Sequence, residues 1–156
     1  MEIQKIILDE TEEEDLCIGL VSMAKQVPDY AFFFKINQIN PFCFQRIDDL
    51  VIEGFYYRYH FPVFEGYHSE TKTQYRFIAN KSSESFQKRQ ITELFSEEQN
   101  IKFLLNDFPN ADYIIKSSDK FPDFSLLLQP ENLVFKFQEI LLSSNEELYQ
   151  TIQYYE

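Results

Sequence analysis

The stretch that decides the fold is 73–79, which reads TQYRFIA. Tyr75 and Phe77 alternate with Gln74 and Arg76, and this period of two places successive side chains on opposite faces of a β-strand. Further stretches rich in β-branched and aromatic residues are 3–8, 16–23, 42–47, 50–61, 113–116 and 133–140. The chain is therefore predicted to build a sheet from most of its length.

Helices are predicted between these strands. Pro28-Asp29 gives a start signal, aromatic residues follow at spacings of three and four, and Asn40 precedes a proline, so we expect a helix over 29–39. The remaining helical predictions are a short helix within 91–105, a turn or two within 121–128 and a terminal helix over 144–155 that Ser144 caps.

The connections are predicted from charge and length. The acidic run 9–15 predicts a solvated loop that joins strands 3–8 and 16–23 as a hairpin. Asp48-Asp49 predicts a turn, 62–72 a long connecting loop, and 81–89 a polar loop.

Strand runs with a few helices and no regular βαβ alternation are typical of an α+β fold. We expect a mainly antiparallel sheet of about five to seven strands with two to four helices packed on it. The 156 residues, 44% of them hydrophobic, form a single globular domain over 1–156. A chain of this size buries roughly two-thirds of its unfolded surface, enough to fold without disulfides or a metal.

The charge of −12 makes nucleic acid and anionic membranes improbable partners, because both repel an acidic chain. The charge is uneven: residues 16–92 carry nine basic and seven acidic residues, so an anionic ligand would bind there. The acidic balance fits either simple solubility or a specific basic partner. No apolar run is long enough for a signal peptide or a membrane span, which predicts a cytoplasmic protein.

Several chemistries lack their motifs. Three isolated glycines cannot form a phosphate-binding loop, and no G-x-S-x-G sequence is present. Cys17 and Cys43 lie 26 positions apart without histidine at ligand spacing, so we expect two buried, reduced thiols. His60 and His68 are the only histidines and fit surface or interface packing better than catalysis. We expect no metal and no cofactor, and the chain is more readily a binding protein than an enzyme.

One sheet face is a candidate binding site. If strand 50–61 pairs with strand 73–79 so that the two arginines are neighbours, that face carries Tyr56, Arg58, His60, Gln74 and Arg76. Like charges placed opposite each other destabilise a strand pair, so the arginines need acids. The acids belong to this chain, to a protein partner, or to a nucleotide or RNA.

The segment 105–113, LNDFPNADY, resembles the signature of the IPExxxVDY family of Bacteroidetes proteins. Asp112 and Tyr113 match the signature, Leu105, Asp107 and Ala111 are conservative replacements, and Asn106 stands where the family has proline. Further similar stretches are the two opening strands, a helix that carries Asn37, the strand end 80–82, and 132–135. No activity of the family is known to us, so the resemblance points to source and compartment and leaves function open. Because Asp112 and Tyr113 lead into an apolar strand, we expect the signature residues to be architectural.

These patterns favour a non-enzymatic protein-interaction or regulatory domain. The alternative is a small-molecule or nucleotide-binding domain that uses the arginine-bearing face. Neither the partner nor the oligomeric state follows from the sequence.

Overall fold

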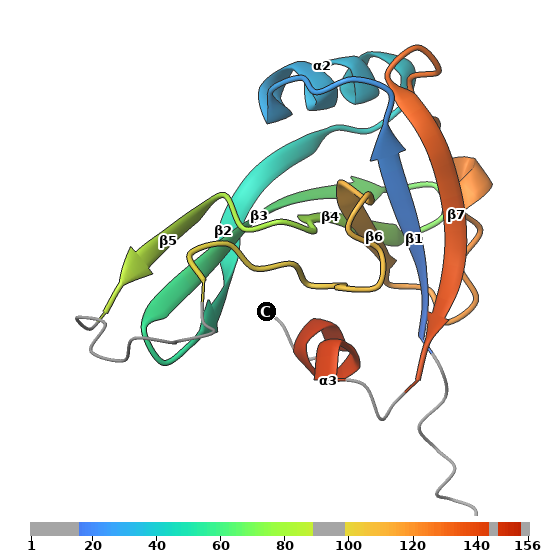
Figure 1. The fold of residues 1–156 in the computed structure, drawn as a ribbon. Helices are drawn as coiled ribbons and strands as arrows, with labels where there is room; N and C mark the ends of the chain where they lie inside the picture. The colour runs from blue at the N-terminus through green and yellow to red at the C-terminus, as the bar shows by residue number, and fades with distance from the viewer. Residues whose placement is uncertain (1–15, 89–98, 144–146, 154–156) are drawn as a thin grey trace, which may run out of the picture.

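The computed structural model describes residues 16–88, 99–143 and 147–153, which form one twisted antiparallel sheet with helices on its two faces (Figure 1). The strands are β1 (Leu16–Met23), β2 (Phe44–Glu53), β3 (Tyr57–His68), β4 (Thr73–Ala79), β5 (Glu84–Gln87), β6 (Tyr113–Ser117) and β7 (Val134–Leu142). The helical elements are α2 (Asp29–Ile39), the 3-10 helix η2 (Phe124–Leu126) and α3 (Glu147–Gln153).

The strand order is β2-β3-β4-β6-β1-β7, so β2 and β7 form the two edges. The long strand β3 has two neighbours on one side, because His68 to Val63 pair with β4 and His60 to Tyr57 pair with β5. Figure 1 shows β5 leaving the body of the sheet along the far end of β2 and β3. β1 lies between β6 and β7, which come from the opposite end of the chain.

The first half of the sheet departs from the sequence prediction. Strand 50–61 is interrupted at Gly54, whose amide donates to the Tyr57 carbonyl and closes the β2–β3 turn. The predicted turn at Asp48-Asp49 is a bulge inside β2, where the pairing with β3 shifts register. Pro62 lies opposite this bulge and between the β5 and β4 pairings, where its missing N–H costs least. The predicted loops 62–72 and 81–89 were wrong, because they contain most of the second half of β3 and all of β5.

The helix predicted over 29–39 is confirmed as α2. Its buried face carries Phe32, Phe33 and Ile36, which pack on one face of the sheet with Phe64 and Phe77. The Phe33 ring stacks on Phe64 with ring centres 3.9 Å apart. This aromatic layer explains why a short helix is stable here: its packing rather than its propensity holds it.

Two asparagines join α2 to the rest of the fold. The Asn37 side chain accepts from the Phe44 amide at 2.7 Å and donates to the Phe44 carbonyl at 3.1 Å. Asn40 treats Leu128 in the same way, at 2.8 and 3.0 Å. Each asparagine side chain thus pairs with the N–H and C=O of one residue, as a neighbouring strand would.

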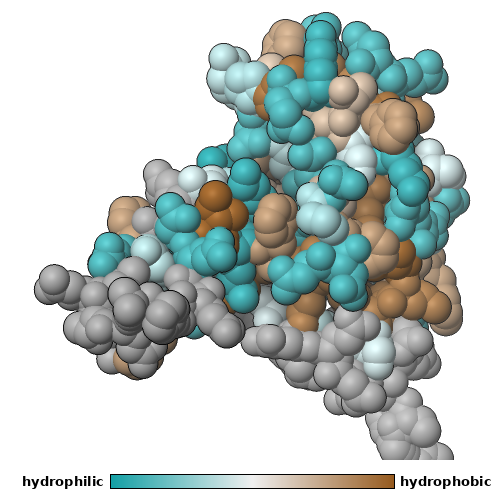
Figure 2. All heavy atoms as spheres, viewed as in Figure 1, coloured by the Kyte–Doolittle hydropathy of each residue, from teal (hydrophilic) through white to brown (hydrophobic). Residues whose placement is uncertain are grey.

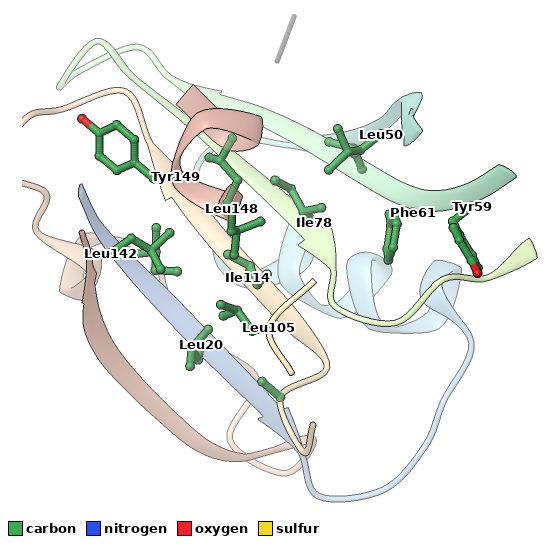
Figure 3. Packing of buried hydrophobic residues seen from close by; sticks show 14 residues of the cluster. Leu20, Leu50, Tyr59, Phe61, Ile78, Leu105, Ile114, Leu142, Leu148 and Tyr149 are labelled. Carbon is green, nitrogen blue, oxygen red and sulfur yellow. The ribbon is translucent and has the colours of Figure 1, made fainter. Parts of the chain in front are cut away.

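The other face of the sheet has its own core, formed by β-strand residues, the segment that follows residue 99, and α3 (Figure 3). Leu148, Tyr149 and Ile152 of α3 are buried there with Ile114 and Ile78. The sheet is therefore covered on both faces, which explains why apolar side chains of its central strands β4 and β6 are buried on both sides.

The predicted fold class was wrong. The described residues form a seven-stranded antiparallel sheet in which α2 is the only helix longer than two turns, so the protein is richer in sheet than an α+β fold with two to four helices. Within the predicted helix 91–105, the described residues 99–105 are not helical. The expected strand 3–8, the acidic loop 9–15 and the Ser144 cap lie outside the described residues. None of the described helices has the length and apolarity that a bilayer crossing requires.

Candidate functional site

The arginine-bearing face assumed from the sequence does not assemble. In the observed register Arg76 lies opposite Glu65, and Arg58 lies opposite Glu53 and Phe86. Arg76 is two residues from Ile78 and so lies on the same face of the sheet, which is the face of the core that contains Ile78 and Tyr59. Arg58 is next to Tyr59 in β3 and so points to the other face. The two arginines therefore lie on opposite faces.

Each arginine is paired within the chain. The Arg58 Nε lies 2.7 Å from Glu53 Oε2, and Lys88 Nζ lies 2.8 Å from the other oxygen of this carboxylate. The two cations lower the pKa of Glu53 below its usual value. Arg76 Nε lies 2.9 Å from Glu65 Oε2. Of the alternatives for the acids, the geometry thus shows acids of this chain, Glu53 and Glu65, beside the two arginines.

The other three predicted site residues are also dispersed. Tyr56 is buried in the β2–β3 turn with its ring against Phe55. The His60 Nδ1 lies 3.4 Å from Asp49 Oδ2. Gln74 lies opposite Tyr67, and its backbone N–H donates to the Ser118 hydroxyl.

Asn80, directly after β4, organises the segment that carries the predicted family signature. Its side chain is fully buried, and its Oδ1 accepts from the Leu105 amide at 2.8 Å. Its Nδ2 donates to the carbonyls of Phe108 and Ala111 at 2.9 and 3.0 Å. Its backbone accepts from Leu104 and donates to the Asp112 carbonyl. The side chain and the backbone of Asn80 thus make five hydrogen bonds to the segment 104–112.

Asp112 and Tyr113 close the segment against two other elements. Asp112 Oδ2 accepts from the Met23 amide at 2.7 Å, and Oδ1 accepts from the Gln26 side chain. The buried Tyr113 hydroxyl donates to Asp29 Oδ1 at the start of α2. Burial raises the pKa of Tyr113, and the hydrogen bond to Asp29 and the charges of both aspartates raise it further. The phenol therefore remains a donor at every physiological pH.

The remaining signature residues fall into two groups. Leu105 and Ala111 are buried in the core that α3 covers, whereas Asp107 is exposed. The resemblance pointed to this segment, but the role of Asn80 was not predicted. The available sequence signal was an asparagine directly after a predicted strand, because such a side chain readily hydrogen-bonds backbone groups nearby.

Three hollows border this segment. The largest, about 860 Å³, is lined by Ala111, Asp112 and Tyr113 together with Asp29 and Lys81. A second of about 570 Å³ lies between the segment and β7, and a third of about 340 Å³ lies beside α3. Neither Arg58 nor Arg76 lines any of the three. These three hollows therefore lie around the signature segment and not at the predicted face.

The cysteines are free, and the prediction that both are buried was wrong for Cys43, which is exposed. Cys17 is partly buried, with its Sγ 3.6 Å from Glu139 Oε1. Burial and this carboxylate raise the pKa of the Cys17 thiol. Within the described residues, no three histidine, cysteine or acidic side chains are grouped in a way that would hold a metal ion.

The fold defines a sheet-rich domain with several hollows around one segment. Comparison with family models, curated proteins and solved structures finds no match to this chain. The resemblance at 105–113 therefore stays a prediction.

Proposed function

We propose that the protein is a non-enzymatic protein-interaction domain of the cytoplasm that binds an extended segment of a partner along β7. The observation that carries the proposal is the character of this edge. β7 is nine residues long, it ends the strand order, and no strand among the described residues pairs with its outer side. Every second amide and carbonyl of an edge strand points outward and is available to an added strand.

Exposed apolar side chains accompany this open edge. Phe135 is 76% exposed and Leu141 is 63% exposed, near the two ends of β7. Figure 2 shows hydrophobic surface along the lower end of β7, at the right of the view. Long apolar edges invite pairing, and folded proteins usually protect them with charge or a bulge. β7 has Lys136, Glu139 and one shift of register against β1, yet it keeps two exposed apolar side chains, which fits a surface that a partner covers.

The hollow of about 570 Å³ beside β7 supports the same proposal. Phe135, Lys136 and Gln138 contribute one wall, and the signature segment contributes the opposite wall. In strand addition the backbone provides affinity, and pockets for alternate side chains provide specificity. A partner strand on β7 would direct every second side chain to the sheet face where this hollow lies.

We also propose that the chain is a divergent member of the IPExxxVDY family. The burial of Leu105, Ala111 and Tyr113 and the hydrogen bonds of Asp112 support a structural reason for such a signature. The arginine-bearing face is not carried forward as a ligand site, because its arginines are paired with acids of this chain.

Affinity purification of the tagged full chain from its native cell, with identification of the captured proteins, tests the interaction. We expect Phe135→Lys with Leu141→Lys to abolish capture and to leave the melting temperature unchanged. The matched control is Val51→Lys on β2, the opposite edge, where the side chain is also exposed. Equal capture by the β7 variant and the control would contradict the proposal.

A further inference from the structure

The hollow of about 860 Å³ lies where β4 ends and β6 begins, beside the first turn of α2. Its volume is within the range of small-ligand pockets, which is about 300 to 1,000 Å³. It adjoins the β7 hollow, and five residues border both of them: Met23, Gln26, Pro109, Ala111 and Asp112. Its apolar wall includes Val27, Ile101 and Phe103.

Two carboxylates that line this cavity accept hydrogen bonds from other residues of its wall. Asp29 receives the Tyr113 hydroxyl on Oδ1, and Asp112 receives the Met23 amide and the Gln26 side chain. Both acids lie near enough to the Tyr113 hydroxyl to act on it electrostatically. Fixed acids of this kind lose little conformational entropy when they bind a ligand.

The hydrogen-bonding capacity of these acids is not exhausted. An ionised carboxylate offers about four acceptor positions. Asp29 uses one of them in the hydrogen bonds of the described residues, and Asp112 uses two. The basic residue that lines the cavity is Lys81, whose side chain is exposed and therefore free to place its ammonium in water. The fixed charge at the cavity wall is negative.

We propose that this cavity binds an organic cation, a protonated amine or a guanidinium, with its charged head at Asp29 and Asp112. Its apolar stem lies against Val27 and Phe103. The ligand is either a free alkylamine or a basic side chain of another protein, since both present the same head and stem. The net charge of −12 favours the approach of either.

Backbone amide NMR on the full chain tests this site with three probes of equal length: n-butylammonium, n-butanol and butyrate. We expect n-butylammonium to shift the amide signals of Met23 and Tyr113 with a Kd on the order of 1 mM, and the other two to bind at least tenfold more weakly. The peptides acetyl-Gly-Arg-Gly-amide and acetyl-Gly-Glu-Gly-amide form a second arm. Tighter binding of the arginine peptide than of n-butylammonium assigns the source to a protein side chain, and the reverse assigns it to a free amine.

The variant Asp29→Asn removes the charge and keeps an oxygen that accepts from Tyr113. We expect it to weaken n-butylammonium binding at least tenfold, with unchanged amide signals elsewhere as evidence of an intact fold. Asp107→Asn is the matched control, because Asp107 belongs to the same segment and does not line this cavity. Lys81→Gln should strengthen binding.

Equal binding of butyrate or n-butanol, no binding of n-butylammonium at about 10 mM, or full binding by Asp29→Asn would each overturn the proposal. The β7 proposal is judged separately, because Phe135→Lys with Leu141→Lys should leave n-butylammonium binding unchanged.

Discussion

The signature segment and β7 border the same hollow, but one has buried polar groups and the other has exposed apolar side chains. The segment places backbone groups of Leu105, Phe108 and Ala111 in the interior, where the buried Asn80 side chain hydrogen-bonds them. β7 carries Phe135 and Leu141 outward, where no described residue covers them. Buried polar groups that are fully satisfied specify a structure, and exposed apolar groups provide a contact surface. Changes in the segment should therefore affect folding, and changes in β7 should affect binding.

The largest effect is expected from Tyr113→Ala. The ring is 5% exposed and stacks on Phe32 at 5.1 Å, so its removal leaves a cavity in the aromatic core. We expect a loss of about 3 to 5 kcal/mol in the free energy of unfolding, measured by urea denaturation. If the variant keeps wild-type stability and loses a captured partner, Tyr113 has a role in binding and not in the core.

Asn80→Ala should cost almost as much, about 2 to 4 kcal/mol, because it removes the partner of the Leu105 amide and of the Ala111 carbonyl and one of the two donors to the Phe108 carbonyl. Asn110→Ala is the control: this asparagine is exposed in the same segment, and its removal should change stability by less than about 0.5 kcal/mol. Similar losses for the two variants would show that the buried network does not hold the segment.

The raised pKa of Tyr113 predicts a loss of stability in base. The unfolded phenol ionises near pH 10, while the folded phenol keeps its proton. The contribution of the protonated Tyr113 hydroxyl to the free energy of unfolding is therefore complete below about pH 10. Above that pH it declines by up to about 1.4 kcal/mol per pH unit. The stability difference between wild type and Tyr113→Phe should narrow from pH 9 to about pH 11 in urea denaturation. A difference that is constant across this range would contradict the assignment.

A smaller contrast is expected between the two thiols. Cys43 is exposed, whereas burial and Glu139 keep Cys17 protonated. A thiol reagent at neutral pH should label Cys43 at least tenfold faster than Cys17 in the folded protein, and both at similar rates in urea. Mass spectrometry of peptides from a time course measures the two rates, and equal rates in the folded protein would contradict the burial of Cys17.

The parts of the fold that the sequence predicted are those with an undisturbed period. β1, α2 and β4 begin and end where the pattern placed them, because alternation or helical spacing runs through each without interruption. Errors arose where one residue changed the register. Gly54 ends a strand inside an aromatic run, and the bulge at Asp48-Asp49 allows two charged residues to remain within β2.

The candidate site was predicted less well, because its residues come together only in one particular register of strand pairing. Whether Arg58 lies near Arg76 depends on the register of β3 with β4, and a period of two cannot define register. The structural role expected for Asp112 and Tyr113 stays a prediction, which the Tyr113→Ala variant tests; their hydrogen bonds join the segment to Met23 and Asp29. The hollows could not be predicted, since they depend on residues far apart in the sequence.

Hydrogen exchange at the edges of the sheet tests the central claim most directly. With the captured partner added, every second amide of β7 should exchange more slowly, since an added strand accepts from the amides that point away from β1. The amides of β2, the opposite edge, should be unchanged. Slower exchange at β2 with no change at β7 would contradict the account.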